Sequence, residues 1–146
     1  MALRAYISGA LLHAADLAAA RQLYERFAEA CEHAGWEAYV PHQHADPVRD
    51  AALTNQQVVR RDLDELTASD AIVAFVGEPS LGVGAELAVA LARGKRVLAL
   101  APDGTRVSRF LLGLLELHPA QASVFRYRSV DDAATWIARA LGERRV

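Results

Sequence analysis

Residues 71–76 form an unbroken apolar run, Ala-Ile-Val-Ala-Phe-Val, in the middle of the chain. A strand without polar alternation has both of its faces buried, which is typical of a parallel sheet covered by helices on both sides. A glycine-containing segment that begins a helix, Pro79 to Leu87, follows the run directly. The run therefore predicts an α/β protein with a buried central strand.

Strand-like and helix-like segments alternate along the chain. Strands are predicted at residues 4–8, 36–40, 71–76, 96–101 and 123–127. Helices are predicted at residues 16–34, 57–67, 82–93, 107–117 and 130–141, with residues 41–56 as a loop. Interleaved strands and helices favour a parallel sheet with helices on both faces. We expect a single Rossmann-like domain over residues 1–146, with the flavodoxin-like strand order 2-1-3-4-5.

Composition excludes several classes of protein. Of the 146 residues, 53% are hydrophobic and 23% charged, which argues against a disordered chain. A net charge of −2 argues against a protein that binds a nucleic acid polymer. No apolar segment approaches the roughly 20 residues that span a bilayer, and no signal peptide is visible. The single cysteine, Cys31, excludes an internal disulfide and fits a reducing, cytoplasmic location.

The segment from Pro79 to Leu87 is the first candidate binding site. Ligands of such sheets bind beyond the carboxyl ends of the strands, here residues 8–10 and 77–80. Gly82 and Gly84 allow a close approach of the backbone, free amides attract an anion, and Ser80 adds a hydroxyl. The segment lacks the Lys-Ser/Thr of a P-loop and the G-x-G-x-x-G order of dinucleotide sites. The alternative is an ordinary turn with Ser80 as helix cap.

Two carboxylates are candidates for catalysis. Glu86 is expected in the first turn of the helix at 82–93, facing the crevice; the alternative is a glutamate favoured there by the helix dipole. Asp62 lies within the apolar stripe of the helix at 57–67, four residues from both Val58 and Leu66. A buried carboxylate is costly unless it is partnered or functional. Pairing with an arginine or capping of a loop is the structural alternative for Asp62.

Tyr6 and His42 allow two interpretations each, and His44 and Cys31 are considered beside them. Tyr6 is either a hydrogen-bond donor to a carboxylate in the crevice or a core aromatic. His42 either lines a substrate pocket or is an exposed loop histidine. His42 and His44 could suggest a metal, but no acidic or cysteine partner has ligand-like spacing. Cys31 lies on the apolar face of its helix, which favours core packing.

Several of these segments together resemble a known family. The resemblance covers roughly residues 4–115 and rests on the segments Tyr6–Gly9, Pro41–His42, Asp62–Leu66, Ser69–Ala74 and Pro79–Leu87. The set resembles the nucleoside 2-deoxyribosyltransferase superfamily. It is most similar to the 2'-deoxynucleoside 5'-phosphate N-hydrolase branch, which includes cytidine-nucleotide hydrolases. The string Pro-Ser-Leu-Gly-Val-Gly-x-Glu-Leu is its most specific element.

The resemblance implies a Rossmann-like sheet, a homodimer or higher oligomer, a nucleotide or nucleoside substrate, and neither metal nor organic cofactor. It implies that Glu86 attacks the anomeric carbon, that Asp62 protonates the leaving base or steers it, and that Tyr6 positions Glu86. Ser80 would hold the 5'-phosphate, and Ser108 would serve the phosphate site of the neighbouring subunit. The implied pocket also includes Gly9, His42, Gly82 and Gly84.

This resemblance predicts hydrolysis of the N-glycosidic bond of a (deoxy)nucleoside 5'-monophosphate through a covalent glycosyl-Glu86 intermediate. Exchange of bases on deoxyribose, or a non-catalytic nucleotide-binding module, are the alternatives. The chemistry needs a carboxylate that traps an oxocarbenium-like sugar and an acid that assists the leaving group. Two such acids need different environments. We expect the helix dipole to keep Glu86 ionised and burial to keep Asp62 protonated.

The loop after the first strand departs from the family pattern. The phosphate hydrolases carry Gly-Ser-x-Arg-Gly-Gly there, whereas this chain has Gly-Ala-Leu-Leu-His-Ala at residues 9–14. The serine and the arginine are absent, which removes a cationic clamp and makes the pocket more apolar. His13 is a candidate for partial compensation.

Overall fold

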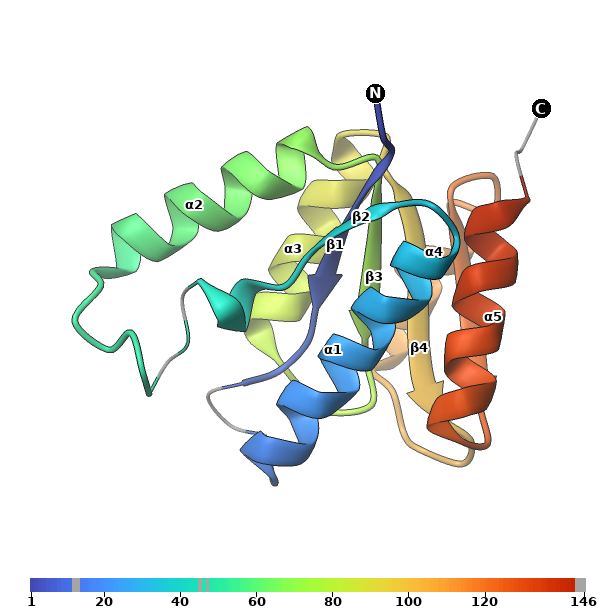
Figure 1. The fold of residues 1–146 in the computed structure, drawn as a ribbon. Coiled ribbons are helices and arrows are strands. Elements are labelled where there is room, and N and C mark those ends of the chain that lie inside the picture. Colours follow the sequence, from blue (N-terminus) through green and yellow to red (C-terminus); the bar gives the residue numbers. More distant parts are fainter. Residues whose placement is uncertain (12–13, 45, 47, 144–146) are drawn as a thin grey trace.

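A five-stranded sheet, with all neighbouring strands parallel, forms the centre of the computed structural model, which describes residues 1–11, 14–44, 46 and 48–143 (Figure 1). Its order is β2-β1-β3-β4-β5. The strands are β1 (Arg4–Ser8), β2 (Glu37–Tyr39), β3 (Ala71–Phe75), β4 (Arg96–Pro102) and β5 (Ala122–Tyr127). The helices are α1 (Leu17–His33), the 3-10 helix η1 (Pro41–Gln43), α2 (Asn55–Ala68), α3 (Leu81–Ala92), α4 (Arg109–Glu116) and α5 (Val130–Gly142). The predicted fold class and strand order are confirmed.

The sheet is covered on both faces, because alternate side chains of each strand point to opposite sides. Ile7 and Val73 belong to the core cluster that includes residues of α1 and α5. Tyr6 and Ile72 belong to the cluster on the opposite face, which includes residues of α2, α3 and α4. Figure 1 shows α1 and α5 side by side on one face of the sheet and α3 on the other. Cys31 is fully buried in the first cluster, as predicted.

Capping side chains move two helix boundaries from their predicted positions. The helix α2 begins at Asn55 rather than Gln57, because Thr54 and Gln57 form a reciprocal capping box. With η1, this shortens the loop predicted over residues 41–56. The helix α4 begins at Arg109 rather than Val107, because the hydroxyl of Ser108 accepts a hydrogen bond from the Leu111 amide.

The topology opens a crevice at the carboxyl ends of the strands. Strand β1 pairs with β2 on one side and with β3 on the other. The connections that leave β1 and β2 pass over opposite faces, so the carboxyl ends of β1 and β3 lie between α1 and α3. This is the point of an open α/β sheet at which ligands bind. None of the helices in the described ranges is both long and apolar enough to cross a membrane.

Gly9 is required at the end of β1 by the packing of Tyr24. A Cβ atom at position 9 would overlap the Tyr24 ring, whose hydroxyl donates a 2.7 Å hydrogen bond to the carbonyl of Ala10. We expect Gly9→Ala to lower the free energy of unfolding by about 1–3 kcal/mol, the usual effect of overpacking. Urea denaturation measures this change.

Gly84→Ala is the matched control, because a Cβ atom there meets no described atom within 4 Å and Gly84 lies inside α3. This control should raise the stability by up to about 1 kcal/mol through helix propensity. Equal effects of the two substitutions would contradict the packing role of Gly9.

Candidate active site

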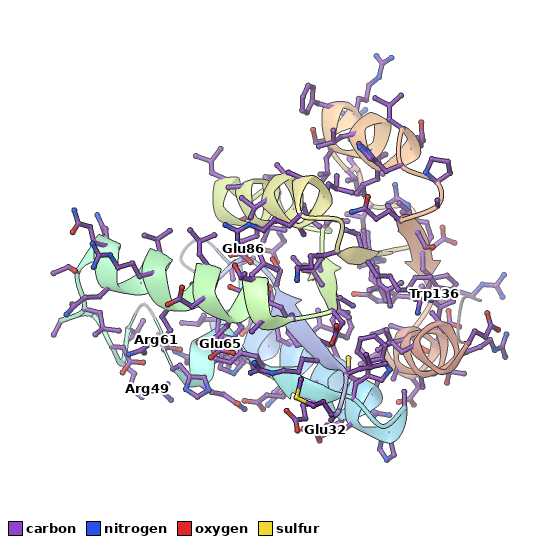
Figure 2. All side chains as sticks on the ribbon, turned by 90° about the horizontal axis from the view of Figure 1, so that it is seen from above. Glu32, Arg49, Arg61, Glu65, Glu86 and Trp136 are labelled. Carbon is purple, nitrogen blue, oxygen red and sulfur yellow. The ribbon has the colours of Figure 1, made fainter. Side chains whose placement is uncertain are left out.

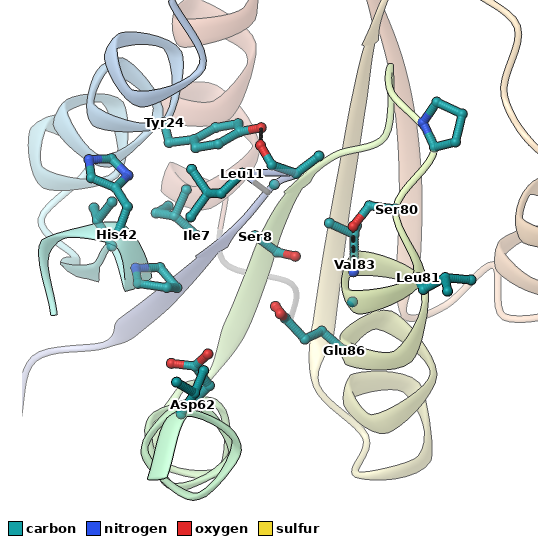
Figure 3. Close-up of a pocket in the computed structure, with 17 residues that line it drawn as sticks. Ile7, Ser8, Leu11, Tyr24, His42, Asp62, Ser80, Leu81, Val83 and Glu86 are labelled. Atoms are coloured by element: carbon teal, nitrogen blue, oxygen red, sulfur yellow. Dashed lines mark hydrogen bonds between the residues drawn. The ribbon is translucent and has the colours of Figure 1, made fainter. Parts of the chain in front are cut away.

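A cavity of about 620 Å³ lies at the carboxyl ends of β1 and β3. Figure 3 shows its lining, which comes from β1, α1, η1, α2 and the start of α3. Apolar side chains form most of the wall. The polar residues that line it are Ser8, Tyr24, His42, Asp62, Ser80 and Glu86.

Asp62 and Glu86 point into this cavity from two different helices, α2 and α3 (Figure 3). Figure 2 shows Glu86 between these helices. The Oδ1 atom of Asp62 and the Oε2 atom of Glu86 are buried, and neither has a hydrogen-bond partner among the described residues. Within the described ranges Asp62 forms no ion pair with an arginine, so the structural alternative for this residue is not met. The predicted convergence of the two carboxyl groups is confirmed.

The same two side chains also line a second cavity, of about 630 Å³, between α2 and α3. Val58 and Gly82 are shared between the two cavities. The carboxyl groups therefore lie where the two spaces meet. A ligand seated against them can extend toward either side.

The position of Glu86 in its helix differs from the prediction. Ser80 is the N-cap of α3, and its hydroxyl accepts a hydrogen bond from the Val83 amide at 3.2 Å. Glu86 is therefore beyond the first turn, which contains no acidic residue. The field of a helix terminus falls off within the first turn, so the helix dipole does not hold Glu86 ionised.

Burial dominates the protonation of both acids. It raises the pKa of Glu86 to about 7, with a smaller contribution from Asp62, while the hydroxyls of Ser8 and Tyr6 oppose the rise. Burial also raises the pKa of Asp62 to about 6, against the attraction of Arg61. The prediction that the helix dipole keeps Glu86 ionised is thus wrong, whereas burial favours the protonated form of Asp62, as predicted. Because the two carboxyl groups interact, they titrate as a pair, with one shared proton near neutral pH.

Two hydroxyl groups of β1 lie beside Glu86. Tyr6 and Ser8 are two residues apart on one strand, so their side chains point to the same face as α3. Both hydroxyl oxygens are buried, without a hydrogen-bond partner at normal distance in the described part of the chain. Ser8 was not among the predicted site residues. Its spacing of two from Tyr6, at the carboxyl end of a predicted strand, is the signal that identifies it.

The remaining predicted residues separate into two groups. Ser80, Gly82, Gly9 and His42 line the cavity with the two acids. Gly84 and Ser108 instead line a neighbouring cavity of about 600 Å³ between α3 and α4, which Ser80 also borders. His13 lies outside the described residues.

The position of His42 also differs from that of an exposed loop histidine. Its side chain is buried, and its Nε2 atom lies 3.0 Å from a carboxyl oxygen of Glu25, a residue of α1 that the sequence did not single out. His44 stacks on Tyr39, with ring centroids 4.7 Å apart. In the described residues no group of three His, Cys, Asp or Glu side chains is arranged to hold a metal ion.

The raised pKa of Glu86 has a consequence for stability. A carboxyl group that binds its proton more tightly in the folded state destabilises the fold as the pH rises from about 4.5 to about 7. We therefore expect Glu86→Gln to raise the free energy of unfolding by about 1–3 kcal/mol at pH 8. At pH 5, where folded Glu86 is protonated, the gain should be smaller. Urea denaturation at both pH values measures it.

Glu32→Gln is the matched control for this experiment. Glu32 is exposed on α1, and Figure 2 shows it at the outer side of that helix. Its substitution should leave the stability within about 0.5 kcal/mol at both pH values. A gain from Glu86→Gln that is the same at pH 5 and pH 8 would refute the ionic origin of the effect.

Comparison with known proteins identifies relatives of the chain. The family model described as nucleoside 2-deoxyribosyltransferase matches residues 5–136, beyond the 4–115 of the sequence resemblance. A Methanosarcina mazei protein named "Putative 2'-deoxynucleoside 5'-phosphate N-hydrolase 1" is 40% identical over 99 residues, which cover 64% of this chain and 61% of that protein. The mouse 5-hydroxymethyl-dUMP N-hydrolase is 48% identical over 59 residues, 40% of this chain and 34% of that enzyme. The chain thus spans only about half the length of the curated relatives that it matches. For a relative from Thermofilum pendens, the match covers 54% of that protein.

Solved structures share the fold. The CMP N-glycosidase BcmB of Clostridium botulinum superposes with a TM-score of 0.71 at 20% identity, over 94% of this chain and 98% of that one. A conserved protein of Enterococcus faecalis superposes with a TM-score of 0.73 at 22% identity, over 96% and 99%. These identities establish a common fold only. The match of the family model over residues 5–136 shows that the chain belongs to the nucleoside 2-deoxyribosyltransferase family.

Proposed function

We propose that this protein hydrolyses the N-glycosidic bond of a (deoxy)nucleoside 5'-monophosphate, releasing the free base and the sugar 5-phosphate. The observation that carries the proposal is the convergence of Asp62 and Glu86 in one cavity, each with a buried carboxyl oxygen that has no hydrogen-bond partner among the described residues. Relatives named as N-hydrolases of nucleoside 5'-phosphates support the same reaction.

The two acids have distinct roles in the proposed mechanism, which starts from the state of the pair in which Asp62 carries the shared proton and Glu86 is ionised. The hydroxyls of Tyr6 and Ser8 favour this state, because they stabilise ionised Glu86. An ionised oxygen of Glu86 attacks the anomeric carbon, the bond between this carbon and the base breaks, and its electron pair moves to the base nitrogen. Asp62 gives its proton to the departing base. Water then attacks the anomeric carbon and gives a proton to ionised Asp62, and the bond to Glu86 breaks. This double displacement suits a carboxylate held beside an oxocarbenium-like transition state.

Tyr6 and Ser8 are proposed to position the nucleophile. Their hydroxyls lie on the β1 side of Glu86 and favour its ionised form. Burial also raises the pKa of Tyr6 above its ordinary value, so this phenol keeps its proton and can donate it in a hydrogen bond. A donor on one carboxylate oxygen leaves the other oxygen free to attack.

The start of α3 is the proposed site of the 5'-phosphate. Leu81 and Gly82 line the cavity, and the first amides of a helix form an anion site with the positive end of its dipole. The hydroxyl of Ser80 accepts from the Val83 amide and keeps its own proton for a phosphate oxygen. No arginine or lysine lies among the described residues of the cavity wall, so the affinity for phosphate rests on these neutral donors. Ser108 of a second copy would complete the site, which makes a homodimer part of the proposal.

Base transfer is the second candidate function, because the family model is named for transfer of deoxyribose. The same covalent intermediate serves both reactions, and they differ only in whether water or a second base attacks it. Incubation of a deoxynucleoside with a different free base separates them, because only a transferase forms the exchanged nucleoside.

The central test is product release from a panel of nucleoside 5'-monophosphates and the corresponding nucleosides, followed by chromatography. The 5'-monophosphates should be the better substrates, and Glu86→Ala should lower kcat about a thousandfold or more. Glu32→Ala, on the outer side of α1, is the control and should retain full activity. Equal or better turnover of unphosphorylated nucleosides would reject the phosphate site. Binding of nucleotides without turnover would indicate a binding module.

The pH dependence of kcat/KM tests the shared proton. One carboxyl group must be ionised and the other protonated, so we expect a bell-shaped profile with its maximum between about pH 6 and 7. Asp62→Asn should lower the rate about 10²–10⁴-fold and abolish the alkaline limb. The acid limb that remains should report the ionisation of Glu86 alone. Asp64→Asn, an exposed neighbour on α2, is the control. An unchanged alkaline limb in Asp62→Asn would exclude Asp62 as the acid.

A further inference from the structure

The ring of His42 lies between the cavity and the carboxylate of Glu25, a residue of α1. Only 3% of His42 is exposed, and it lines the cavity that contains Asp62 and Glu86. Its Nε2 atom lies 3.0 Å from the Oε1 atom of Glu25, whose side chain on α1 is 47% exposed. Its Nδ1 atom is buried and has no hydrogen-bond partner among the described residues. The ring therefore has one satisfied and one unsatisfied nitrogen.

The hydrogen bond of Nε2 to Glu25 determines whether Nδ1 carries a proton. A carboxylate oxygen only accepts hydrogen bonds, so Nε2 carries the proton, and Nδ1 of a neutral ring is then an acceptor. An imidazolium would instead leave a buried N–H without a partner. Two charged groups act on the ring, Glu25 and Arg49, whose guanidinium donates a 2.6 Å hydrogen bond to the His42 carbonyl.

The orientation of the ring does not depend on Glu25 alone. The ring of Tyr24 lies against His42, with centroids 6.4 Å apart, and Tyr24 is itself anchored to the Ala10 carbonyl. Arg49 holds the backbone of His42 from the opposite direction. The ring of His42 is thus held in place without Glu25. The specific contribution of Glu25 is to determine which ring nitrogen carries the proton.

Figure 3 shows His42 on the wall across the cavity from Ser80, on the side of Asp62. In the proposed reaction the phosphate lies at Ser80 and the leaving base at Asp62, so His42 faces the base. We propose that Glu25 is a positioning residue that holds His42 as its Nε2–H tautomer, so that Nδ1 accepts a hydrogen bond from an N–H or O–H group of the base. The identity of the ligand rests on the proposed function, whereas the tautomer does not.

Nitrogen-15 NMR of the histidine side chains tests the tautomer without any substrate. In the wild type at pH 7.5, His42 should show a protonated Nε2 and an unprotonated Nδ1. In Glu25→Ala the two tautomers should mix. The control is Glu29→Ala, one turn further along α1, because the Glu29 side chain contacts only the Arg26 side chain in the described residues, and this substitution should leave the His42 signals unchanged. An Nδ1–H tautomer or an imidazolium in the wild type would overturn the inference.

A double-mutant cycle tests whether Glu25 acts through His42. Glu25→Ala should raise KM for a nucleotide whose base carries a donor about fivefold with little change in kcat, as expected for one weakened hydrogen bond. In the His42→Ala background, Glu25→Ala should have no further effect. Equal effects in both backgrounds would show that Glu25 is merely structural and would overturn the inference. If the wild type turns over no nucleotide, the proposed function fails and the NMR result alone decides the tautomer.

Discussion

The requirement that a parallel sheet be buried on both faces shapes this molecule. Each parallel connection must cross over one face, and the strands β1 and β3 are neighbours although α1, β2 and α2 separate them in sequence. The crossovers beside β1 lie on opposite faces, so the carboxyl ends of β1 and β3 border an open crevice instead of a continuous layer of helices. The site residues reach this crevice from strands and helices that the sheet itself holds in place.

Burial of two acids in a mostly apolar wall is the energetic feature of the site. Neither carboxyl group has an ion pair among the described residues, so desolvation raises both pKa values. Such an arrangement destabilises the fold near neutral pH, and functional sites are where perturbed carboxyl groups concentrate. The hydroxyls of Tyr6 and Ser8 moderate the effect at Glu86, since they favour the ionised form without adding a charge. The site therefore holds one proton between two acids near neutral pH, which suits a reaction that needs both an acid and a nucleophile.

The accuracy of the sequence interpretation depended on how local each feature was. Asp62 interrupts the apolar stripe of a helix, and that pattern correctly indicated a carboxylate on the buried face of the helix, while its catalytic role was implied by the family resemblance. Glu86 was also placed at the crevice, but one turn too close to the helix start. The helix α3 begins at Leu81, one residue before its predicted start, so Glu86 falls in the second turn. Ser8 was overlooked, although its spacing from Tyr6 was visible.

Period and order along the chain were sufficient to predict the strand order, the two-sided core and the buried helix face on which Asp62 lies, because these follow from side-chain periodicity and short connections. The order in which the acids bind protons was decided by tertiary structure, because desolvation depends on everything that surrounds a carboxyl group. Tertiary structure also decided that Gly82 lines the cavity of the two acids while Gly84 and Ser108 line the neighbouring one, since this depends on how α3 and α4 pack. The contact between Glu25 and His42 spans 17 residues and joins a helix to the 3-10 turn η1. No periodicity encodes such a pair, because it exists only once α1 has packed against the sheet.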